Sequence, residues 1–198
     1  MPGSTINFNA NQIAIGPGKA WLNVAVPGTG ARLALHTDGT PESVANPNAK
    51  HLGLTEAGTT MKVGNNIESF EADELTAPYR QQLTGDEATI SGNMLQTENT
   101  ELVEKMLPGG TRTTGAGYEQ VTFGGKITIT GFSVAVIAPT AADPTKFAVF
   151  QLYNCINFGG LEYTLSRKTP SSSPFEFQGQ SVSTRVEGDQ VGSYWKQV

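Results

Sequence analysis

Apolar and polar residues alternate along much of this chain, and the alternation predicts β-strands. In residues 88–95, Ala88, Ile90 and Met94 alternate with polar neighbours. A period of two is typical of a strand with one buried face. The same pattern, interrupted by Gly and Pro, predicts further strands at residues 19–26, 54–63, 67–74, 120–123, 126–130, 132–138, 161–167 and 175–184.

Residues 147–157 differ from the other strands because they are apolar on both faces. Val149 and Tyr153 lie on one face, and Phe150 and Leu152 lie on the other. Continuous apolar strands are typical of sheet centres that are covered on both sides. We therefore expect this strand to be the central strand of the fold.

One segment, residues 98–107, has the pattern of a helix. Thr97 is placed to act as its N-cap, and Leu102 and Met106 are four residues apart on one face. Pro108-Gly109-Gly110 would end it. Together the elements predict an all-β (mainly β) fold, a β-sandwich or barrel with one flanking α-helix.

The chain divides into three parts. Residues 1–18 are predicted to be an N-terminal arm, residues 19–185 a single β domain, and residues 186–198 a polar C-terminal tail. Within the domain, residues 27–53 form a long loop rich in Pro, Gly and Asn. Loops of this length are uncommon in compact domains, so we expect this one to be either functional or disordered.

Composition and charge exclude several classes of protein. Only 16% of residues are charged, and the formal net charge is −5, so the chain lacks the basic surface that grips nucleic acid. A single cysteine excludes an intrachain disulfide framework. No signal-peptide pattern is present, and the longest apolar run, residues 132–138, is too short to span a membrane. We expect a soluble protein that does not insert into membranes.

Catalytic chemistry has little support in the sequence. His36 and His51 both lie in the long loop, and Cys155 lies in the most apolar strand, where cysteine behaves as a small hydrophobic residue. Glu71 and Asp73 share a strand face but lack the spacing of a metal site. We predict no enzymatic activity, no metal and no cofactor.

Acidic residues are concentrated between Gly53 and Glu104. This window holds ten acidic and two basic residues, a net charge of −8, so the rest of the chain is +3. Such a division is compatible with subunits that attract each other head to tail, or with a surface that repels an anion. Solvation of hairpin turns is an equally simple explanation.

Several segments in order resemble one family. They are Thr55-Glu56-Ala57-Gly58, residues 67–74, residues 84–90 with the capped helix that follows, residues 147–153, residues 160–167 and residues 174–177. Together they resemble the major tail tube proteins of long-tailed, siphovirus-like bacteriophages. The similarity covers about half of the chain and depends on the order of the segments, since no single motif is diagnostic.

The resemblance implies a specific biology. Tail tube proteins are β-sandwiches with one flanking helix, a fold shared with type VI secretion tubes, and they form hexameric rings that stack into a hollow tube for genome ejection. The expected partners are copies of the chain itself, the tape measure, tail terminator and tail tip proteins, and double-stranded DNA only as passing cargo. The expected location is the virion tail, after assembly in the host cytoplasm.

Residue hypotheses follow from this resemblance. We predict that Glu56, Glu71 and Asp73 face the lumen, because acidic walls repel DNA, and that subunit interfaces include His36, His51, Tyr194 and Trp195. Two alternatives stay open: another virion β-protein, such as a head decoration protein, and a monomeric carbohydrate-binding β-sandwich module. The second would need exposed aromatic residues in a groove, whereas most aromatic residues here fit strand patterns as core.

Overall fold

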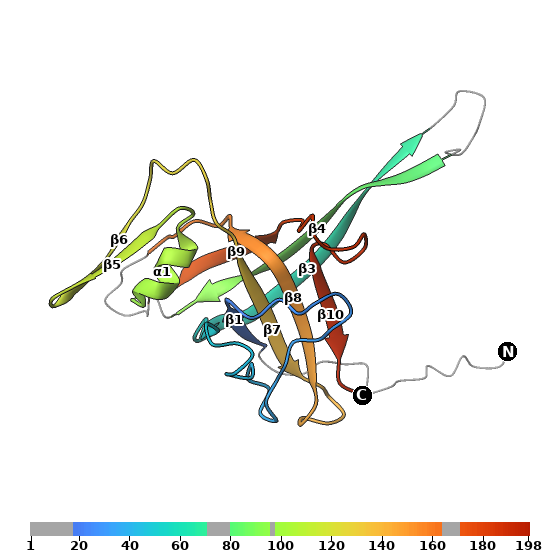
Figure 1. The fold of residues 1–198 in the computed structure, drawn as a ribbon, viewed down its shortest axis with the longest axis horizontal. Helices are drawn as coiled ribbons and strands as arrows, with labels where there is room; N and C mark the ends of the chain where they lie inside the picture. Colours follow the sequence, from blue (N-terminus) through green and yellow to red (C-terminus); the bar gives the residue numbers. More distant parts are fainter. Residues whose placement is uncertain (1–17, 71–79, 96–97, 164–170) are drawn as a thin grey trace.

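The computed structural model describes residues 18–70, 80–95, 98–163 and 171–198 (Figure 1). The protein is mainly β, with one large antiparallel sheet, a small two-stranded hairpin and one short helix. The elements are β1 Lys19–Leu22, β2 Lys50–His51, β3 Thr55–Phe70, β4 Arg80–Met94, α1 Thr100–Met106, β5 Thr111–Gly115, β6 Tyr118–Thr122, β7 Phe132–Pro139, β8 Phe147–Asn157, β9 Ser173–Gly179 and β10 Gly192–Lys196.

The large sheet has the strand order β2-β1-β7-β8-β9-β4-β3, and β10 also pairs with β8. Every pairing is antiparallel. Over the described residues, β2 and β3 end this order and do not pair with each other, so the sheet is not closed. Of the architectures expected from the sequence, the closed barrel is therefore wrong.

Strand β8 is the centre of the fold, as its apolar sequence predicts. It runs from Phe147 to Asn157, and nine of its eleven residues are buried. One edge pairs with β7 along most of its length. The other edge is shared, because β10 pairs with Ala148–Leu152 and β9 pairs with Cys155–Asn157. The sheet therefore forks at β8 into two branches.

Two apolar clusters cover the two faces of this centre. The larger one gathers side chains from β1, β4, β7, β8, β9 and α1, including Ile90, Leu152 and Phe177. Phe177 packs between the rings of Phe132 and Phe175, with ring centroids 5.4 and 5.0 Å away. Helix α1 contributes Leu102 and Met106, both buried.

The second cluster is covered by the long loop that precedes β2. Val24 and Leu33 pack on Ile137 and Val149 of β7 and β8. Buried Asn46 holds the loop together, since its Oδ1 accepts the N–H of Ala25 at 2.7 Å and its Nδ2 donates to the carbonyl of Glu42 at 3.0 Å.

A turn in the same loop requires glycine. Gly39 has φ +77°, and a Cβ there would clash with the ring of Phe147. Residues 27–53 are thus an ordered layer over the sheet, and the disordered alternative expected from the sequence is wrong.

Strands β3 and β4 form a long hairpin that projects from the body (Figure 1). The sequence pattern predicts separate strands at residues 54–63 and 67–74, but β3 is continuous through Gly64, Asn65 and Asn66 because β4 pairs with all three. Strand β9 supports β4 only from Thr89 to Met94. We call the unsupported part, residues 63–70 and 80–88, the projecting hairpin.

The helix starts later in the structure than the sequence predicts. Helix α1 begins at Thr100 and its N-cap is Asn99, whose Oδ1 accepts the N–H of Glu101 at 3.0 Å. The predicted cap, Thr97, lies outside the described residues. Asparagine is among the best N-cap residues, so the helix that starts two residues later is also capped by a side chain.

The predicted strand at residues 126–130 is also wrong. Strand β6 pairs instead with β5, around the turn at residues 116–117, and residues 126–130 form no strand. Likewise, residues 161–163 are not in a strand, and the rest of the predicted strand 161–167 lies outside the described residues. The predicted C-terminal tail contains β10, so part of it belongs to the sheet.

Candidate interaction surfaces

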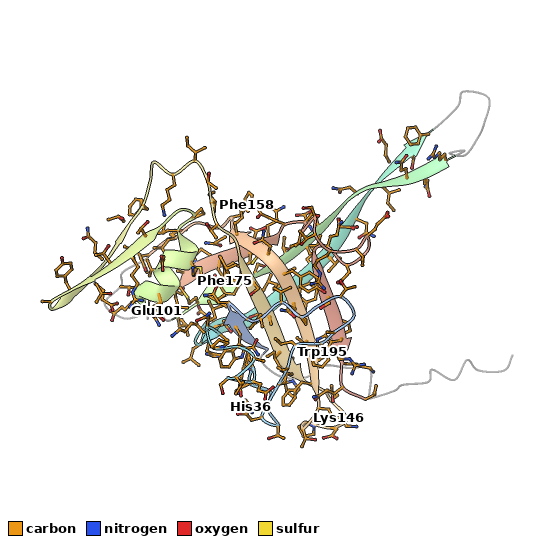
Figure 2. All side chains as sticks on the ribbon, in the orientation of Figure 1. His36, Glu101, Lys146, Phe158, Phe175 and Trp195 are labelled. Carbon is orange, nitrogen blue, oxygen red and sulfur yellow. The ribbon has the colours of Figure 1, made fainter. Side chains whose placement is uncertain are left out.

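The residues that the sequence singles out do not gather at one place. Glu56 is exposed on β3, whereas Glu71 and Asp73 lie outside the described residues. Figure 2 shows His36 and Trp195 toward one end of the molecule, far from Glu101 on α1. We therefore consider surfaces of the molecule, one after another.

The two histidines are in different environments. His36 is exposed, and its Nε2 accepts the N–H of Ser43 at 3.4 Å within the loop. His51 is half-buried against Trp21, with ring centroids 4.9 Å apart and an interplanar angle of 71°, and its Nδ1 accepts the N–H of Gly53 at 3.0 Å. Burial lowers the pKa of His51, and the nearby charge of Lys19 lowers it further. His51 thus packs within its own chain, and folding favours its neutral form.

Tyr194 and Trp195 lie on opposite faces of β10. Trp195 pairs in register with Val149 and packs on the second apolar cluster, so it contributes to the core of its own chain. Tyr194 is 63% exposed and lines a groove beside the base of the projecting hairpin. Of the two residues, only Tyr194 offers most of its side chain to a partner.

The outer face of β3, β4 and β9 is polar. In antiparallel sheets, directly paired residues point to the same face. The register therefore places Glu56 with Asn93, and Thr60 with Ser91 and Glu176, on one face. The opposite face carries Ile90 and Phe177, which are buried in the larger cluster. Carboxylates, amides and hydroxyls dominate the outer face.

The inner face of this hairpin continues into solvent as an apolar surface. Met61 pairs with Ile90 and Val63 pairs with Ala88, so these side chains extend the core face. Val63 and Ile67 are 62% and 61% exposed. The projecting hairpin thus carries an apolar stripe that no described part of the chain covers.

A second exposed apolar region lies at the other end of the molecule, beyond α1 (Figure 1). It comprises Tyr118 on β6 and three residues of the segment that follows, Phe123, Ile127 and Ile129. Ile127 is 99% exposed and Phe123 is 73% exposed. Two large hydrophobic side chains this exposed mark an interaction surface more than single scattered residues do.

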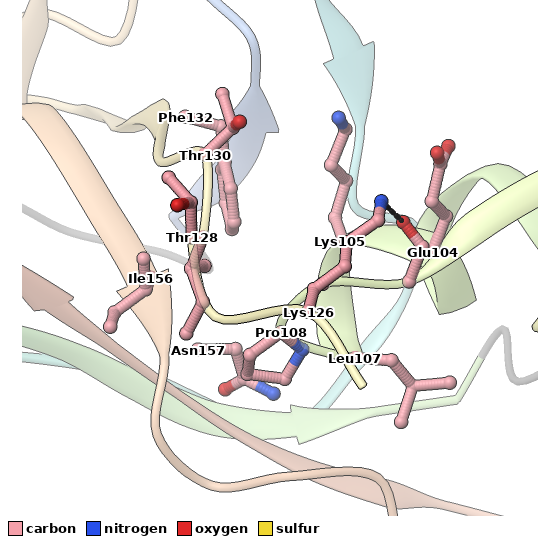
Figure 3. Close-up of a pocket in the computed structure, with 13 residues that line it drawn as sticks. Glu104, Lys105, Leu107, Pro108, Lys126, Thr128, Thr130, Phe132, Ile156 and Asn157 are labelled. Carbon is pink, nitrogen blue, oxygen red and sulfur yellow. Dashed lines mark hydrogen bonds between the residues drawn. The ribbon is translucent and has the colours of Figure 1, made fainter. Parts of the chain in front are cut away.

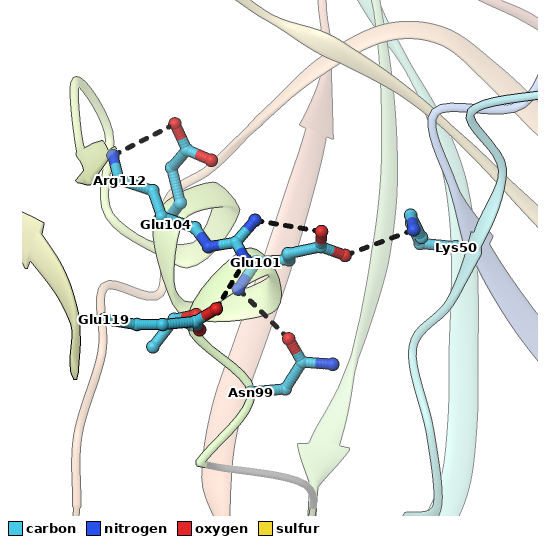
Figure 4. Close-up of polar contacts among 7 residues, drawn as sticks. Lys50, Asn99, Glu101, Glu104, Arg112 and Glu119 are labelled. Carbon is cyan, nitrogen blue, oxygen red and sulfur yellow. Dashed lines mark hydrogen bonds and ion pairs between the residues drawn. The ribbon is translucent and has the colours of Figure 1, made fainter. Parts of the chain in front are cut away.

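Ion pairs fix the position of hairpin β5–β6 against α1 (Figure 4). Arg112 Nη1 lies 2.9 Å from Glu101 Oε1, and Arg112 Nη2 lies 2.8 Å from Glu119 Oε1. Lys50 extends the network to β2, since its Nζ lies 3.3 Å from Glu101 Oε2. Lys50 and Arg112 lower the pKa of Glu101. Partly exposed ion pairs contribute little stability each, so their main effect here is to orient the hairpin.

A pocket of about 190 Å³ lies between α1 and the segment after β6 (Figure 3). Lys126, Thr128 and Thr130 line it, and the Lys126 Nζ donates to Thr111 Oγ1 at 2.7 Å. Ile129 also lines the pocket, whereas Ile127 does not and is almost fully exposed. The pocket is small and polar, and it presents no arrangement of nucleophile and base.

The remaining reactive group, Cys155, is buried in β8. Its Sγ donates to the carbonyl of Phe132 at 3.0 Å, and burial raises the pKa of its thiol. A buried thiol of this kind is structural. In the described part of the chain, no group of three or more His, Cys, Asp and Glu side chains could hold a metal ion.

Sequence reasoning missed two of these surfaces. It assigned residues 126–130 to a strand, although Gly124-Gly125 could have indicated that the chain leaves the sheet there. It also assigned Met61 and Val63 to a half-buried face, since alternation shows which residues share a face but not whether anything covers it.

Comparison with known proteins adds no relative. No protein-family model matches the sequence, and no curated protein is significantly similar to it. None of the helices in the described ranges is long and apolar enough to cross a membrane.

Proposed function

We propose that this protein is a structural subunit that polymerises through the projecting hairpin, and that the polymer is the tail tube of a bacteriophage. The observation that carries self-assembly is the apolar stripe of Met61, Val63 and Ile67, which continues the core face into solvent. An isolated two-stranded hairpin is marginally stable in water, so such a stripe is expected to be covered in the functional state. The unpaired edge of β3 is a further place for another chain to bind.

The assembly would be heterologous. The two exposed apolar regions differ in sequence and lie at opposite ends of the long axis (Figure 1). A contact between unlike surfaces repeats from copy to copy, and it closes into a ring or continues as a filament. The resemblance to tail tube proteins implies stacked hexameric rings. Such an assembly would combine contacts that close each ring with contacts that repeat along the tube.

A sandwich related to tail tube and type VI secretion tube proteins would account for the large core. Strands β4 and β9 contribute side chains such as Ile90 to the larger cluster, and strands β1, β7 and β8 contribute side chains such as Val136. Two sheet regions that share a core in this way support a sandwich, and α1 lies at its flank.

The polar outer face of β3, β4 and β9 is our candidate for the lumen. Glu56, Thr60 and Ser91 would present a carboxylate and hydroxyls to passing DNA. Glu71 and Asp73 lie outside the described residues, so their place in the lumen stays a prediction. Repulsion between carboxylates and phosphates acts over about 8–10 Å at physiological salt, which keeps DNA from adhering to the wall. Tape measure, terminator and tip proteins would be the other partners, in the virion tail.

Electron microscopy of the purified full chain tests this proposal. We expect rings or hollow tubes in negative stain, and a uniform monomer at every concentration would overturn the proposal. The lumen assignment has its own test, with gold attached to a Glu56→Cys variant. Gold along the tube axis is expected, and gold along the outer wall would refute the assignment but leave the tube intact.

A further inference from the structure

A groove of about 790 Å³ runs between the base of the projecting hairpin and strand β10. Val63, Val191 and Tyr194 line it as apolar side chains, and Asp86 and Glu187 supply its only charges. No described residue forms an ion pair with either carboxylate. The groove has room for several side chains, since one water occupies about 30 Å³. It is therefore apolar within and acidic at its rim.

The segment that follows β6 is apolar and carries a positive charge, so it is complementary to this groove. Residues 123–131 expose Phe123 and Ile127 and carry one charge, that of Lys126. The hydrogen-bond partners of Lys126 are neutral, the carbonyl of Gly110 and the hydroxyl of Thr111. Its positive charge is thus not neutralised by a carboxylate among the described residues.

We propose that residues 123–131 of one copy of this chain bind in the groove of a second copy, with Ile127 between Val63 and Tyr194 and with Lys126 near Asp86 and Glu187. The inference rests on the proposed self-assembly and names the surfaces that meet. No residue of 123–131 lines the groove of its own chain, and Figure 1 shows this segment on the α1 side of β8, whereas the groove lies on the β10 side. Opposite charges at the rim would favour this register over others.

Crosslinking tests the contact in the assembled full chain. A Val63→Cys/Ile127→Cys variant treated with a short bismaleimide should give a ladder of covalent oligomers. The matched control is Val44→Cys/Ile127→Cys, because Val44 is 88% exposed but lies in the loop before β2. The control should stay mainly monomeric on a denaturing gel. The native Cys155 is buried and should not react.

Substitutions test the energetics. Ile127→Asp should weaken association about tenfold or more, as expected for a central interface residue, and it should leave the monomer's melting temperature unchanged. Val44→Asp should change neither. Lys126→Glu and Asp86→Lys should each weaken association, and the double variant should restore most of it, since exchanging the charges recovers the attraction.

The outcomes separate this inference from the proposed function. If the chain polymerises but the Val63→Cys/Ile127→Cys variant gives no crosslinked ladder and Ile127→Asp assembles normally, the contact is overturned. The proposed function would then still stand. A chain that never assembles would overturn both. Slow labelling of Val63→Cys in the isolated monomer would show that the chain itself covers the groove, and would also overturn the contact.

Discussion

Strand β8 and the projecting hairpin are built from the same secondary structure and differ in what covers them. Val149 of β8 is fully buried between two apolar clusters, whereas Val63 of β3 is mostly exposed on a face that continues the core. Burial of a valine side chain is worth about 1.5–3 kcal/mol to folding. That free energy is already gained at Val149, and at Val63 it would be gained only under the proposed assembly. The difference divides the molecule into a body whose apolar side chains are covered and a hairpin whose apolar face is exposed.

The largest effect we predict comes from the same substitution at these two valines. Val149→Asp should destabilise the monomer by more than about 3 kcal/mol, because it buries an unpaired charge. Val63→Asp should leave the unfolding free energy within about 0.5 kcal/mol and should abolish assembly instead. Urea unfolding followed by tryptophan fluorescence measures the first effect, and sedimentation measures the second. Equal destabilisation of the monomer by both substitutions would contradict the claim that Val149 is covered within the monomer and Val63 is not.

The loop over the second cluster should behave as part of the body. Asn46→Ala removes a buried side chain that accepts from Ala25 and donates to Glu42, so it should cost about 1–3 kcal/mol. Asn65→Ala, at an exposed position of the projecting hairpin, is the matched control and should cost less than about 0.5 kcal/mol. Thermal melting of the two variants measures the loss of stability in each. A loss below that of the control would mean that the loop is not part of the cooperative fold.

His51 gives the stability of the body a dependence on pH. Its pKa in the folded chain is lowered, so folding favours the neutral ring, and protonation would remove the acceptor for Gly53 N–H. The corresponding stability is therefore fully present above pH about 6.5, the pKa of an unfolded histidine, and is lost as pH falls below that value. Replacing His51 by Phe should flatten the dependence of the unfolding free energy on pH between pH 7 and 5. An unchanged slope in the His51 variant would contradict this assignment.

The smallest effect on the monomer is expected at the outer part of the projecting hairpin. Ile67→Ser should change the unfolding free energy by less than about 0.5 kcal/mol, because Ile67 is mostly exposed. It should still weaken association, since the apolar stripe loses one of its members. Light scattering at several concentrations measures that loss. A large drop in melting temperature would show that the stripe is already covered within the monomer.

The sequence was most informative where burial is complete. The apolar run of residues 147–157 predicted β8 with its observed bounds, because only a strand covered on both sides can be apolar on both faces. The helix was predicted from Leu102 and Met106, and only its first turn was misplaced, since Asn99 competes with Thr97 for the cap.

Patterns were least informative where the result depends on distant partners. Alternation at residues 126–130 resembles that of a strand, but no described strand pairs with this segment. Strand β6 pairs with β5 instead. Trp195 was predicted as an aromatic interface residue in a polar tail, but this part of the tail is β10, which pairs with β8 and packs Trp195 on the second cluster. Whether a tail is free or paired depends on which sheet edge is vacant, and no local pattern encodes that.

Hydrogen–deuterium exchange in the monomer and in the assembled state tests the central claim most directly. We predict that amides of β8 are protected in both states, whereas amides of the projecting hairpin exchange quickly in the monomer and become protected on assembly. Protection of the projecting hairpin already in the monomer, or its continued fast exchange in the polymer, would contradict the claim that this hairpin folds onto a second copy.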